Sequence, residues 1–592
     1  MNHRVDTRSV CLIRPPSVET FRFSVGSIAP PLGLAYIAGA LESAGHAVTV
    51  VDAVTEAPET YLRYFRGYLL GLPFDEIVDR IPADTKAVGV NSIFTHEWPA
   101  VARLVEVIKE RRPDLPVILG GEHVTSMPEF CLLTSKADYL VMGEGEETII
   151  ELVDAIDRGM PLAELLGIGY RDVAGGDIVV NARRARTLAV DDIPRPAWHL
   201  FDLDTYHEYK WLGGMYSATK SVPMLATRGC PYQCTYCSAP NMWEPRWIPR
   251  EPKQVVDEIE FYVERFDARN FPFQDLTAIV QRQWIIDFCN ELLARDLDIT
   301  WQMPSGTRSE AIDAEVADLL KQTNMISMAY APESGSETTR KMIKKKMKTD
   351  RLFVSMDAAV QSGLNVAAFF VIGFPHDTEE HIRENLDFME TIAEIGITDA
   401  AVGFYMALPG TQMFDSLYEA GKIRLDRKYF KHILAATSPW ATSSYNEDMG
   451  RLKLTIWKWR LMSRFYSQQR KLAGGKGSSG MMGTVRQALE AVRGGDHADS
   501  SKMQTAFRNA IRYGKTTLRV KVQRGWMSRH EEKHYFDDWD RLYREIWTHN
   551  LESGAAVRQP ADSTLLHEHN VTKPLKAAHA TRRRIPVSVE SA

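Results

Sequence analysis

The feature that most constrains the fold of this 592-residue chain is a regular alternation of short β-branched runs with amphipathic stretches. In the first 190 residues, apolar runs typical of strands alternate with segments whose apolar residues recur at helical spacing. The predicted strands are 10–14, 47–52, 87–93, 116–120 and 139–142, and the helices between them include 32–43, 98–111 and 147–158. This order is typical of a parallel, doubly wound sheet, which binds ligands beyond the carboxyl ends of its strands. We therefore predict an α/β protein whose residues 1–190 form a doubly wound, Rossmann-like domain.

A second strand–helix array is predicted at residues 222–425, after a linker at residues 191–221. The segment Asp192-Ile193-Pro194-Arg195-Pro196 favours an extended linker, because each proline pushes the residue before it out of the helical region. The predicted strands of the second array are 224–227, 271–273, 299–302, 326–330, 366–372 and 400–405. Six strands with intervening helices form most of a barrel, so we predict a partial (β/α)6 barrel with its active site at the carboxyl ends of the strands.

The strand pattern ends near residue 426. Aromatic side chains then recur at helical spacing, as in Phe536, Trp539 and Tyr543, which predicts a mainly helical domain at residues 426–550. From residue 551 to residue 592 the periodicity is lost, and we predict a disordered tail.

Composition and charge exclude several classes of protein. The 71 basic and 77 acidic side chains give a net charge of −6, so the chain as a whole does not attract nucleic acid. Six cysteines and a polar first segment without signal-peptide features favour the reducing cytoplasm over a disulfide scaffold. The longest apolar run, residues 366–374, is too short to span a bilayer. These observations predict a soluble cytoplasmic protein.

The most informative short segment is Cys230-Pro-Tyr-Gln-Cys234-Thr-Tyr-Cys237, directly after the first predicted barrel strand. Thiolates clustered on one loop favour a soft metal or an iron–sulfur cluster, and three ligands would leave one iron open to a small molecule. Structural zinc is the alternative, but it requires four ligands, and the spacing of His207 fits no usual zinc pattern. Cys11, Cys131 and Cys289 lie in apolar segments that are typical of buried thiols.

The CxxxCxxC spacing, with Tyr236 before the last cysteine, resembles the signature of the radical S-adenosylmethionine (SAM) superfamily. The resemblance extends to the segments APESGS at 331–336, GFPHDTEE at 373–380 and PGT at 409–411, which follow the fourth, fifth and sixth barrel strands. It implies that Cys230, Cys234 and Cys237 hold a [4Fe–4S] cluster whose fourth iron binds SAM. It also implies SAM contacts at these residues: Tyr236, Asp275, Arg308, Glu333, Gly373 and Pro409.

The first domain resembles the cobalamin-binding domain that precedes the barrel in one large branch of this superfamily. The matching segments are PPLGLA at 30–35, GGEH at 120–123 and GEGEE at 143–147. The resemblance implies cobalamin contacts at Ser92, Thr95, His96, Gly120, Gly121, Glu122, Gly143 and Gly145. Proteins that place a histidine below the cobalt carry an Asp-x-His-x-x-Gly motif. In this chain Asp52 is followed by Ala53 and Val54, so the histidine of the motif is missing. We therefore expect no histidine ligand, and for His96 we favour an ordinary surface histidine over one that faces the corrin ring.

Taken together, the resemblances imply an enzyme that methylates an unactivated carbon of a small molecule with two SAM per methyl group. The substrate classes considered are secondary metabolites, lipids and tetrapyrroles, and the electron donor would be a flavodoxin or ferredoxin. The alternative is a cobalamin-dependent cyclase or rearrangement enzyme, similar to the anaerobic magnesium-protoporphyrin monomethyl ester cyclase. A tRNA-modifying methylthiotransferase is more distant, since it requires a second cysteine trio and a basic RNA-binding module. A non-enzymatic cobalamin sensor needs no CxxxCxxC motif.

One basic aromatic segment leaves two interpretations open. Residues 451–471 contain seven Lys or Arg and no acid, and Leu454, Trp457, Leu461 and Phe465 share one helical face. Such a helix can lie on a membrane surface as a peripheral contact. We favour the other interpretation, in which the apolar face docks on the barrel and the charges are solvated.

Overall fold

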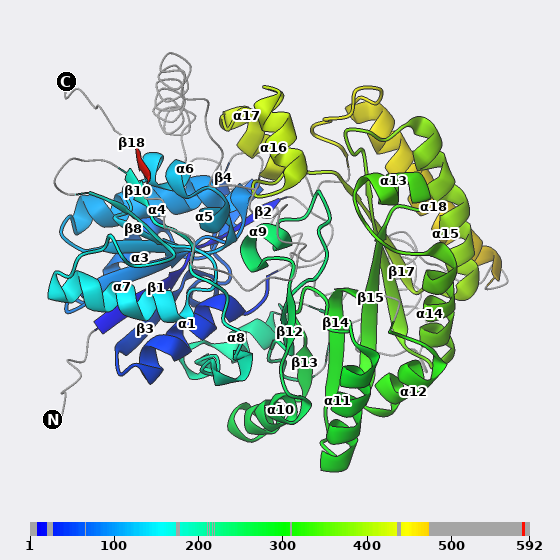
Figure 1. The fold of residues 1–592 in the computed structure, drawn as a ribbon, viewed down its shortest axis with the longest axis horizontal. Helices are drawn as coiled ribbons and strands as arrows, with labels where there is room; N and C mark the ends of the chain where they lie inside the picture. Colours follow the sequence, from blue (N-terminus) through cyan, green and yellow to red (C-terminus); the bar gives the residue numbers. More distant parts are fainter. Residues whose placement is uncertain are drawn as a thin grey trace, which may run out of the picture.

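The computed structural model describes residues 9–20, 28–64, 67–172, 178–209, 211, 214–215, 217, 219–307, 311–434, 440–472 and 583–585. Figure 1 shows two α/β bodies side by side: the N-terminal sheet with its helices, and the barrel with its outer helices. This arrangement confirms the predicted α/β class and the order of the two arrays.

The N-terminal sheet has eight strands in the order β18-β10-β9-β8-β7-β6-β1-β3. Its parallel part consists of β1 (Ser9–Arg14), β3 (Ala47–Asp52), β6 (Ala87–Asn91), β7 (Val117–Gly120) and β8 (Tyr139–Val141). The antiparallel edge consists of β9 (Ile168–Arg171), β10 (Ile178–Val180) and β18 (Arg583–Ile585). β1 pairs with both β3 and β6, so the strand order reverses there, and doubly wound sheets bind ligands at such a reversal.

Side chains of β1 alternate between two apolar layers, as expected for a strand covered on both faces. Val10 and Leu12 belong to the core cluster that contains α1 (Leu32–Ser43) and α7 (Glu146–Arg158). Cys11 and Ile13 belong to the cluster that contains α4 (Trp98–Arg111). The sheet is therefore packed between helices, and its ligand-binding edge is formed by the loops after the strands.

A small antiparallel sheet was not predicted. It has the order β2-β5-β4 and consists of β2 (Ser17–Thr20), β4 (Tyr61–Tyr64) and β5 (Gly67–Leu70). The short helices α2 (Ala53–Glu56), α3 (Phe74–Arg80), α5 (Glu122–Ser126) and α6 (Pro128–Leu133), with the 3-10 turn η1 (Thr95–Glu97), complete the described part of this domain.

The barrel sheet has five parallel strands in chain order: β13 (Asn270–Pro272), β14 (Thr300–Thr307), β15 (Met325–Glu333), β16 (Asn365–Ile372) and β17 (Asp399–Phe404). Its outer helices are α10 (Pro252–Phe266), α11 (Arg282–Arg295), α12 (Ala314–Gln322), α14 (Thr349–Gln361) and α15 (Glu379–Ile395).

The predicted first strand of the barrel is irregular, since isolated bridges join Ser221 to Asn270 and Met224 to Phe273. Pro223 between them has no N–H to donate, which is typical of an edge strand. Residues 227–229, partly predicted as barrel strand, form β11 (Thr227–Gly229), which pairs antiparallel with β12 (Trp247–Pro249).

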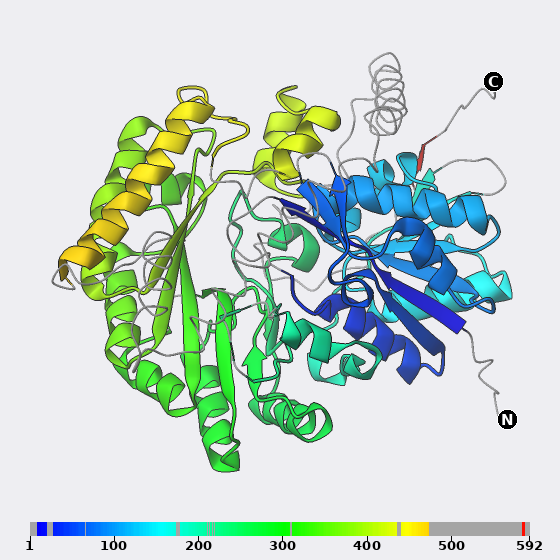
Figure 2. The same ribbon diagram turned by 180° about the vertical axis from the view of Figure 1, so that it is seen from behind.

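In the described part of the chain, three helices follow the barrel: α16 (Gln412–Glu419), α17 (Arg427–Leu434) and α18 (Arg451–Leu472). Figure 2 shows α18 lying along the outer face of the barrel, where it packs on α15 and β17. Leu454, Trp457, Leu461 and Phe465 are buried there. The favoured interpretation, in which this face docks on the barrel, is therefore confirmed, and the same face does not contact a membrane. In the part of the chain that the structure describes, no helix is both long and apolar enough to cross a bilayer.

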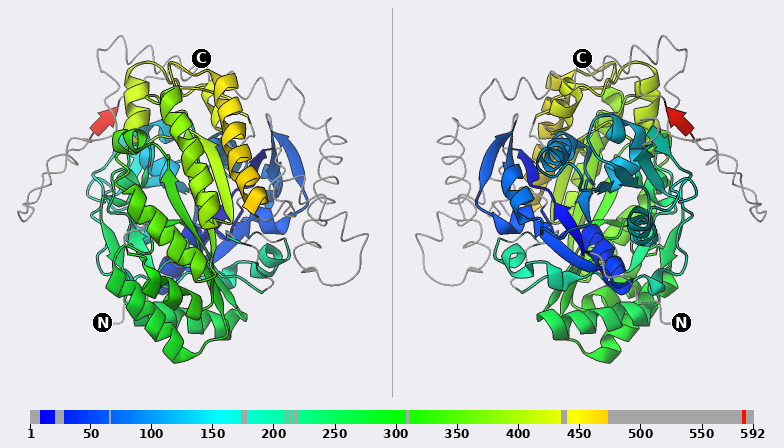
Figure 3. Two further views of the ribbon diagram at one scale, coloured as in Figure 1. Left: turned by 90° about the vertical axis from the view of Figure 1, so that its right-hand side faces the viewer. Right: turned by 90° about the vertical axis from the view of Figure 1, so that its left-hand side faces the viewer.

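The rest of the predicted helical domain, residues 473–550, lies outside the described residues. Within residues 551–592, where we predicted a disordered tail, the described segment is β18, which pairs with β10 at the edge of the N-terminal sheet (Figure 3).

Candidate functional site

The cysteine loop, residues 230–237, leaves the end of β11 through a glycine that the backbone requires. Gly229 has a φ of +84°, and a Cβ atom there would lie 2.2 Å from the carbonyl oxygen of Arg246. The loop is closed by a hydrogen bond of 3.1 Å from the Cys237 N–H to the Cys234 carbonyl. All three of its cysteines are partly exposed, whereas Cys11, Cys131 and Cys289 are buried, as predicted.

The donor set of this loop fits an iron–sulfur cluster. The pKa of Cys237 is raised to about 12, first because protein encloses the thiol and then because Cys234 and Cys230 are charged neighbours. Among the described residues, no three His, Cys, Asp or Glu side chains converge as ligands of one ion. A [4Fe–4S] cluster does not require such convergence, since each cysteine binds a different iron. Three thiols on one loop therefore suit the cluster better than a single zinc ion.

Tyr236 and Glu333, two of the predicted SAM contacts, lie together beside the cysteine loop. The pKa of Tyr236 is well above its ordinary value, first because the hydroxyl is buried and then because the Glu333 carboxylate is near. Glu333 is 8% exposed and ends β15 with a φ of +65°, next to a break in the strand register. Lys345 Nζ lies 3.2 Å from its carboxylate. A non-glycine residue held in this conformation is a feature of functional sites.

The other predicted SAM contacts have roles inside the protein. The buried Asp275 accepts hydrogen bonds from the Ala226 N–H (3.1 Å), the Thr227 N–H (2.6 Å) and the Thr227 hydroxyl (2.6 Å). It therefore fixes the segment that leads into the cysteine loop. The Gly373 N–H donates to Asp377 over 2.9 Å, and Pro409 is buried before Gly410 at the domain boundary. Arg308 lies outside the described residues.

The predicted cobalamin contacts lie at the carboxyl edge of the N-terminal sheet. The Ser92 hydroxyl and Nε2 of His123 are buried and have no hydrogen-bond partner among the described residues. Thr95 Oγ1 lies 3.1 Å from Nδ1 of His123, and His96 stacks on the half-exposed ring of Phe94. Glu122 accepts a hydrogen bond from Ser238 of the barrel domain.

The glycines of this edge serve different purposes. A Cβ atom on Gly121 would lie 2.4 Å from the Ser92 carbonyl oxygen, and one on Gly145 would lie 2.9 Å from Ile37, whereas Gly120 has only ordinary contacts. Gly143 has a φ of +73°, and a Cβ atom there would meet nothing within 4 Å. It lines an open pocket together with residues 183–187 and α9 (Ala239–Trp243). The charged and polar side chains of this lining suit a ligand with many hydrogen-bonding groups, as cobalamin is.

The burial of His123 leads to a testable prediction. Burial lowers its pKa from 6.5 to about 3, so the folded protein keeps the ring neutral. Because the unfolded chain takes up this proton below about pH 6.5, folding stability is full above that pH. It falls by about 1.4 kcal/mol per pH unit as the pH decreases. We expect the imidazole ¹³Cε1 resonance that disappears in His123→Phe to keep its neutral shift from pH 8 to pH 5. A midpoint near pH 6.5 would contradict the burial argument.

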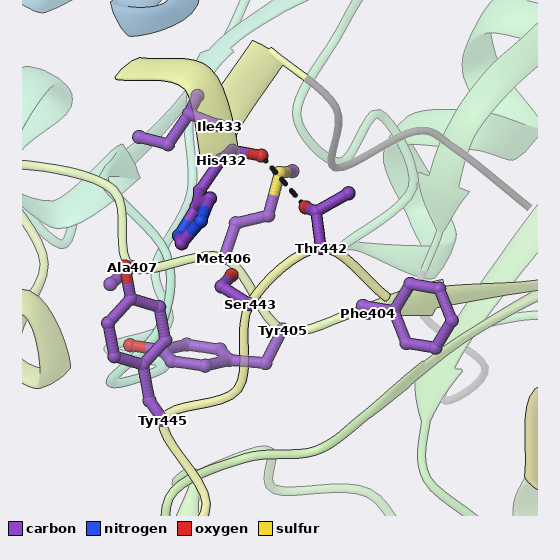
Figure 4. Close-up of a pocket in the computed structure, with 9 residues that line it drawn as sticks. All are labelled: Phe404, Tyr405, Met406, Ala407, His432, Ile433, Thr442, Ser443 and Tyr445. Atoms are coloured by element: carbon purple, nitrogen blue, oxygen red, sulfur yellow. Dashed lines mark hydrogen bonds between the residues drawn. The ribbon is translucent and has the colours of Figure 1, made fainter. Parts of the chain in front are cut away.

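A second pocket, of about 290 Å³, lies at the end of β17 (Figure 4). Its polar lining includes Tyr405, Ser443 and Tyr445 from the chain after β17, and His432 from α17. The Tyr405 hydroxyl is buried without a hydrogen-bond partner among the described residues. Its ring contacts Phe374 (5.3 Å between centroids), and Phe374 contacts Tyr236 (5.5 Å). Aromatic rings thus connect this pocket to the cysteine loop. It was not predicted, because its residues match no motif.

Comparison with known proteins agrees with the two-domain arrangement. A family model described as the B12 binding domain matches residues 19–153, and a Radical SAM superfamily model matches residues 224–389. Cytidylyl-2-hydroxyethylphosphonate methyltransferase of Streptomyces wedmorensis is 28% identical over 437 residues, which cover 67% of this chain and 79% of that protein. The anaerobic magnesium-protoporphyrin IX monomethyl ester cyclase of Rubrivivax gelatinosus is 28% identical over 363 residues, which cover 60% of this chain and 61% of that protein.

Two solved structures share the fold. The cobalamin-dependent SAM radical enzyme OxsB with aqua-cobalamin bound has a TM-score of 0.61 at 15% identity, and the match covers 95% of this chain and 83% of OxsB. The radical SAM methyltransferase TsrM of Kitasatospora setae, with cobalamin and a [4Fe–4S] cluster bound, has a TM-score of 0.54 at 19% identity. The match covers 71% of this chain and 76% of TsrM. The chain carries a B12-binding domain followed by a radical SAM domain, and it is a cobalamin-dependent radical SAM enzyme with cobalamin, SAM and a [4Fe–4S] cluster as its cofactors.

Proposed function

We propose that this enzyme transfers a methyl group to an unactivated carbon of a small molecule and consumes two SAM per methyl group. The observation that carries the proposal is that loops at the carboxyl edge of the N-terminal sheet bond directly to both flanks of the cysteine loop. Two cofactor sites held side by side on one chain suit a reaction that needs hydrogen abstraction and a methyl donor together. The similarity to a named methyltransferase supports the same reaction class.

The bound cluster and SAM supply hydrogen abstraction, and cobalamin supplies the transferable methyl group. The protein's own residues hold these groups and exclude water. Cys230, Cys234 and Cys237 would anchor three irons, and Tyr236 with Glu333 would face the SAM bound at the fourth. An unactivated C–H bond has no acidic proton for a side chain to remove.

Partners and location follow from this proposal. The substrate would be a secondary metabolite, a lipid or a tetrapyrrole, and a flavodoxin or ferredoxin would deliver the electron in the cytoplasm. The net charge of −6 agrees with a substrate other than nucleic acid.

Cyclisation is the second candidate, and the relative from Rubrivivax gelatinosus favours it. The cyclase of the same name from Synechocystis sp. is matched over 78% of its length, about as much as the 79% matched for the phosphonate methyltransferase, so coverage does not rank the two reactions. We place methyl transfer first because a cobalamin site beside the cysteine loop suits a reaction that needs a methyl donor.

Methyl-labelled SAM separates the two reactions. The full chain, reconstituted with iron, sulfide and hydroxocobalamin and reduced with dithionite, is incubated with labelled SAM and a small-molecule extract. Methyl transfer predicts label in protein-bound cobalamin and in a new product, together with both S-adenosylhomocysteine and 5′-deoxyadenosine. A parallel reaction contains magnesium-protoporphyrin monomethyl ester. An unlabelled product formed there with 5′-deoxyadenosine, but without S-adenosylhomocysteine, would reject methyl transfer and support cyclisation.

A further inference from the structure

A buried arginine joins the cysteine loop to the N-terminal domain. Arg228, two residues before Cys230, has a side chain that is 4% exposed. Its guanidinium group lies 3.2 Å from the carboxylate of Glu144, in the loop after β8, and 2.6 Å from the carboxylate of Glu146, the first residue of α7. It also lies over the ring of Tyr36 in α1, 4.7 Å from the centroid. The group is therefore held from several sides by the N-terminal domain.

Glu144 is itself fixed by further contacts. Its second oxygen lies 3.4 Å from Nε of Arg186 and accepts a hydrogen bond of 3.1 Å from the Thr187 N–H. The Arg186 guanidinium lies against Gly229, because a Cβ atom there would be 2.7 Å from its Nη1. Glu144, Glu146, Arg186 and Arg228 thus form one ionic network, which lies against Gly229.

The other flank of the cysteine loop is also bonded to the N-terminal domain. Ser238, directly after Cys237, donates to Glu122. Asn241, one turn further in α9, donates to the Ser126 hydroxyl over 3.1 Å, and α9 packs on α5. Figure 1 shows α9 between the two sheets. Both ends of the cysteine loop are therefore anchored to segments that follow β7 and β8, namely α5, Glu144 and the first residue of α7. The predicted cobalamin contacts Gly120, Gly121, Glu122, Gly143 and Gly145 belong to the same segments.

We propose that Arg228, through Glu144 and Glu146, is a positioning residue that sets the separation of the cluster from the cobalamin. The proposal rests on the assignment of these two cofactors to the two domains. A buried ion pair adds little net stability, because desolvation of both charges offsets their attraction, but it fixes one geometry. The planar guanidinium of Arg228 bonds to its two carboxylates in fixed directions, whereas a lysine ammonium group would act as a point charge without a fixed direction.

The separation of the two paramagnetic centres is a direct readout. The full chain is loaded with its cluster and with hydroxocobalamin and then reduced, and pulsed EPR measures the distance between cob(II)alamin and the reduced cluster. We expect one narrow distance in the parent protein. In Arg228→Gln and in Glu146→Gln we expect a broader distribution with a shifted mean. Arg228→Lys should give an intermediate width, since it keeps the charge but loses the planar contacts.

Arg295→Gln is the matched control. Arg295 also bonds several carboxylates, of Asp257, Glu260 and Glu291, but it links α10 and α11 on the outside of the barrel. Its loss should leave the distance unchanged. If Arg228→Gln fails to bind four irons, the distance measured in Glu146→Gln tests the proposal instead. Glu146 lies in the N-terminal domain, away from the cysteine ligands.

A parent-like distance and width in Glu146→Gln would overturn the proposal. So would a change of equal size in Arg295→Gln. The measurement uses neither substrate nor turnover, so a failure of methyl transfer leaves its result interpretable.

Discussion

Replacing Cys230, Cys234 and Cys237 together with alanine should abolish iron binding and every radical SAM activity of this chain. The three thiols lie on one closed loop, and the other three cysteines of the sequence are buried elsewhere. Iron and sulfide analysis after anaerobic reconstitution, with EPR of the reduced protein, measures the loss.

The matched control is Cys289→Ala, which removes a buried thiol from α11 within the same domain. It should keep the full iron content, and destabilise the fold by about 1 kcal/mol through the lost burial of one small group. Four irons retained in the triple variant would reject the cluster assignment. Equal iron loss in Cys289→Ala would show that the effect comes from misfolding.

The order of strands and helices could be predicted from the sequence because each element has its own periodicity. The strand that contains Val366 and Ile372 is a continuous apolar run, in which buried residues alternate with half-buried ones. The small sheet of β2, β4 and β5 could not be predicted in this way. Its strands have four residues each, and β2 pairs with β5 across some fifty residues of intervening chain, so no local pattern records the pairing.

The site was predictable in residue type but not in side-chain direction. The CxxxCxxC motif pointed to the three cysteines and Tyr236 as candidates, and the end of a predicted strand pointed to Glu333. Asp275 follows its strand in the same way, but it is turned toward the backbone at Ala226 and Thr227, and its three hydrogen bonds are internal. In the segment 143–147, the sequence indicated Gly143 and Gly145 as cobalamin contacts but gave no role to Glu144 and Glu146. These two carboxylates bind Arg228. Only the arrangement of the two domains reveals that partner.

Gly143 is the glycine whose replacement should affect cobalamin most. Its N–H is fixed by a hydrogen bond of 2.9 Å to the Thr125 hydroxyl, and the space beyond its Cα is open pocket. A leucine there would fill the pocket without striking protein. We expect Gly143→Leu to weaken hydroxocobalamin binding by at least about tenfold, which corresponds to about 1.4 kcal/mol. Titration of the full chain, followed by the cobalamin absorbance that remains bound after gel filtration, measures this change.

Gly159→Leu separates loss of the pocket from backbone strain. Gly159 ends α7 in the same domain with a φ of +62°, and a Cβ atom there also meets nothing within 4 Å. Both variants place a leucine in the left-handed region, at a cost of about 1–2 kcal/mol of folding stability. They differ only in that Gly143 lines the pocket and Gly159 does not. Equal cobalamin affinity in the two variants would therefore show that the loop after β8 does not bind cobalamin. A loss of affinity in Gly143→Leu alone would support its place in the cobalamin site.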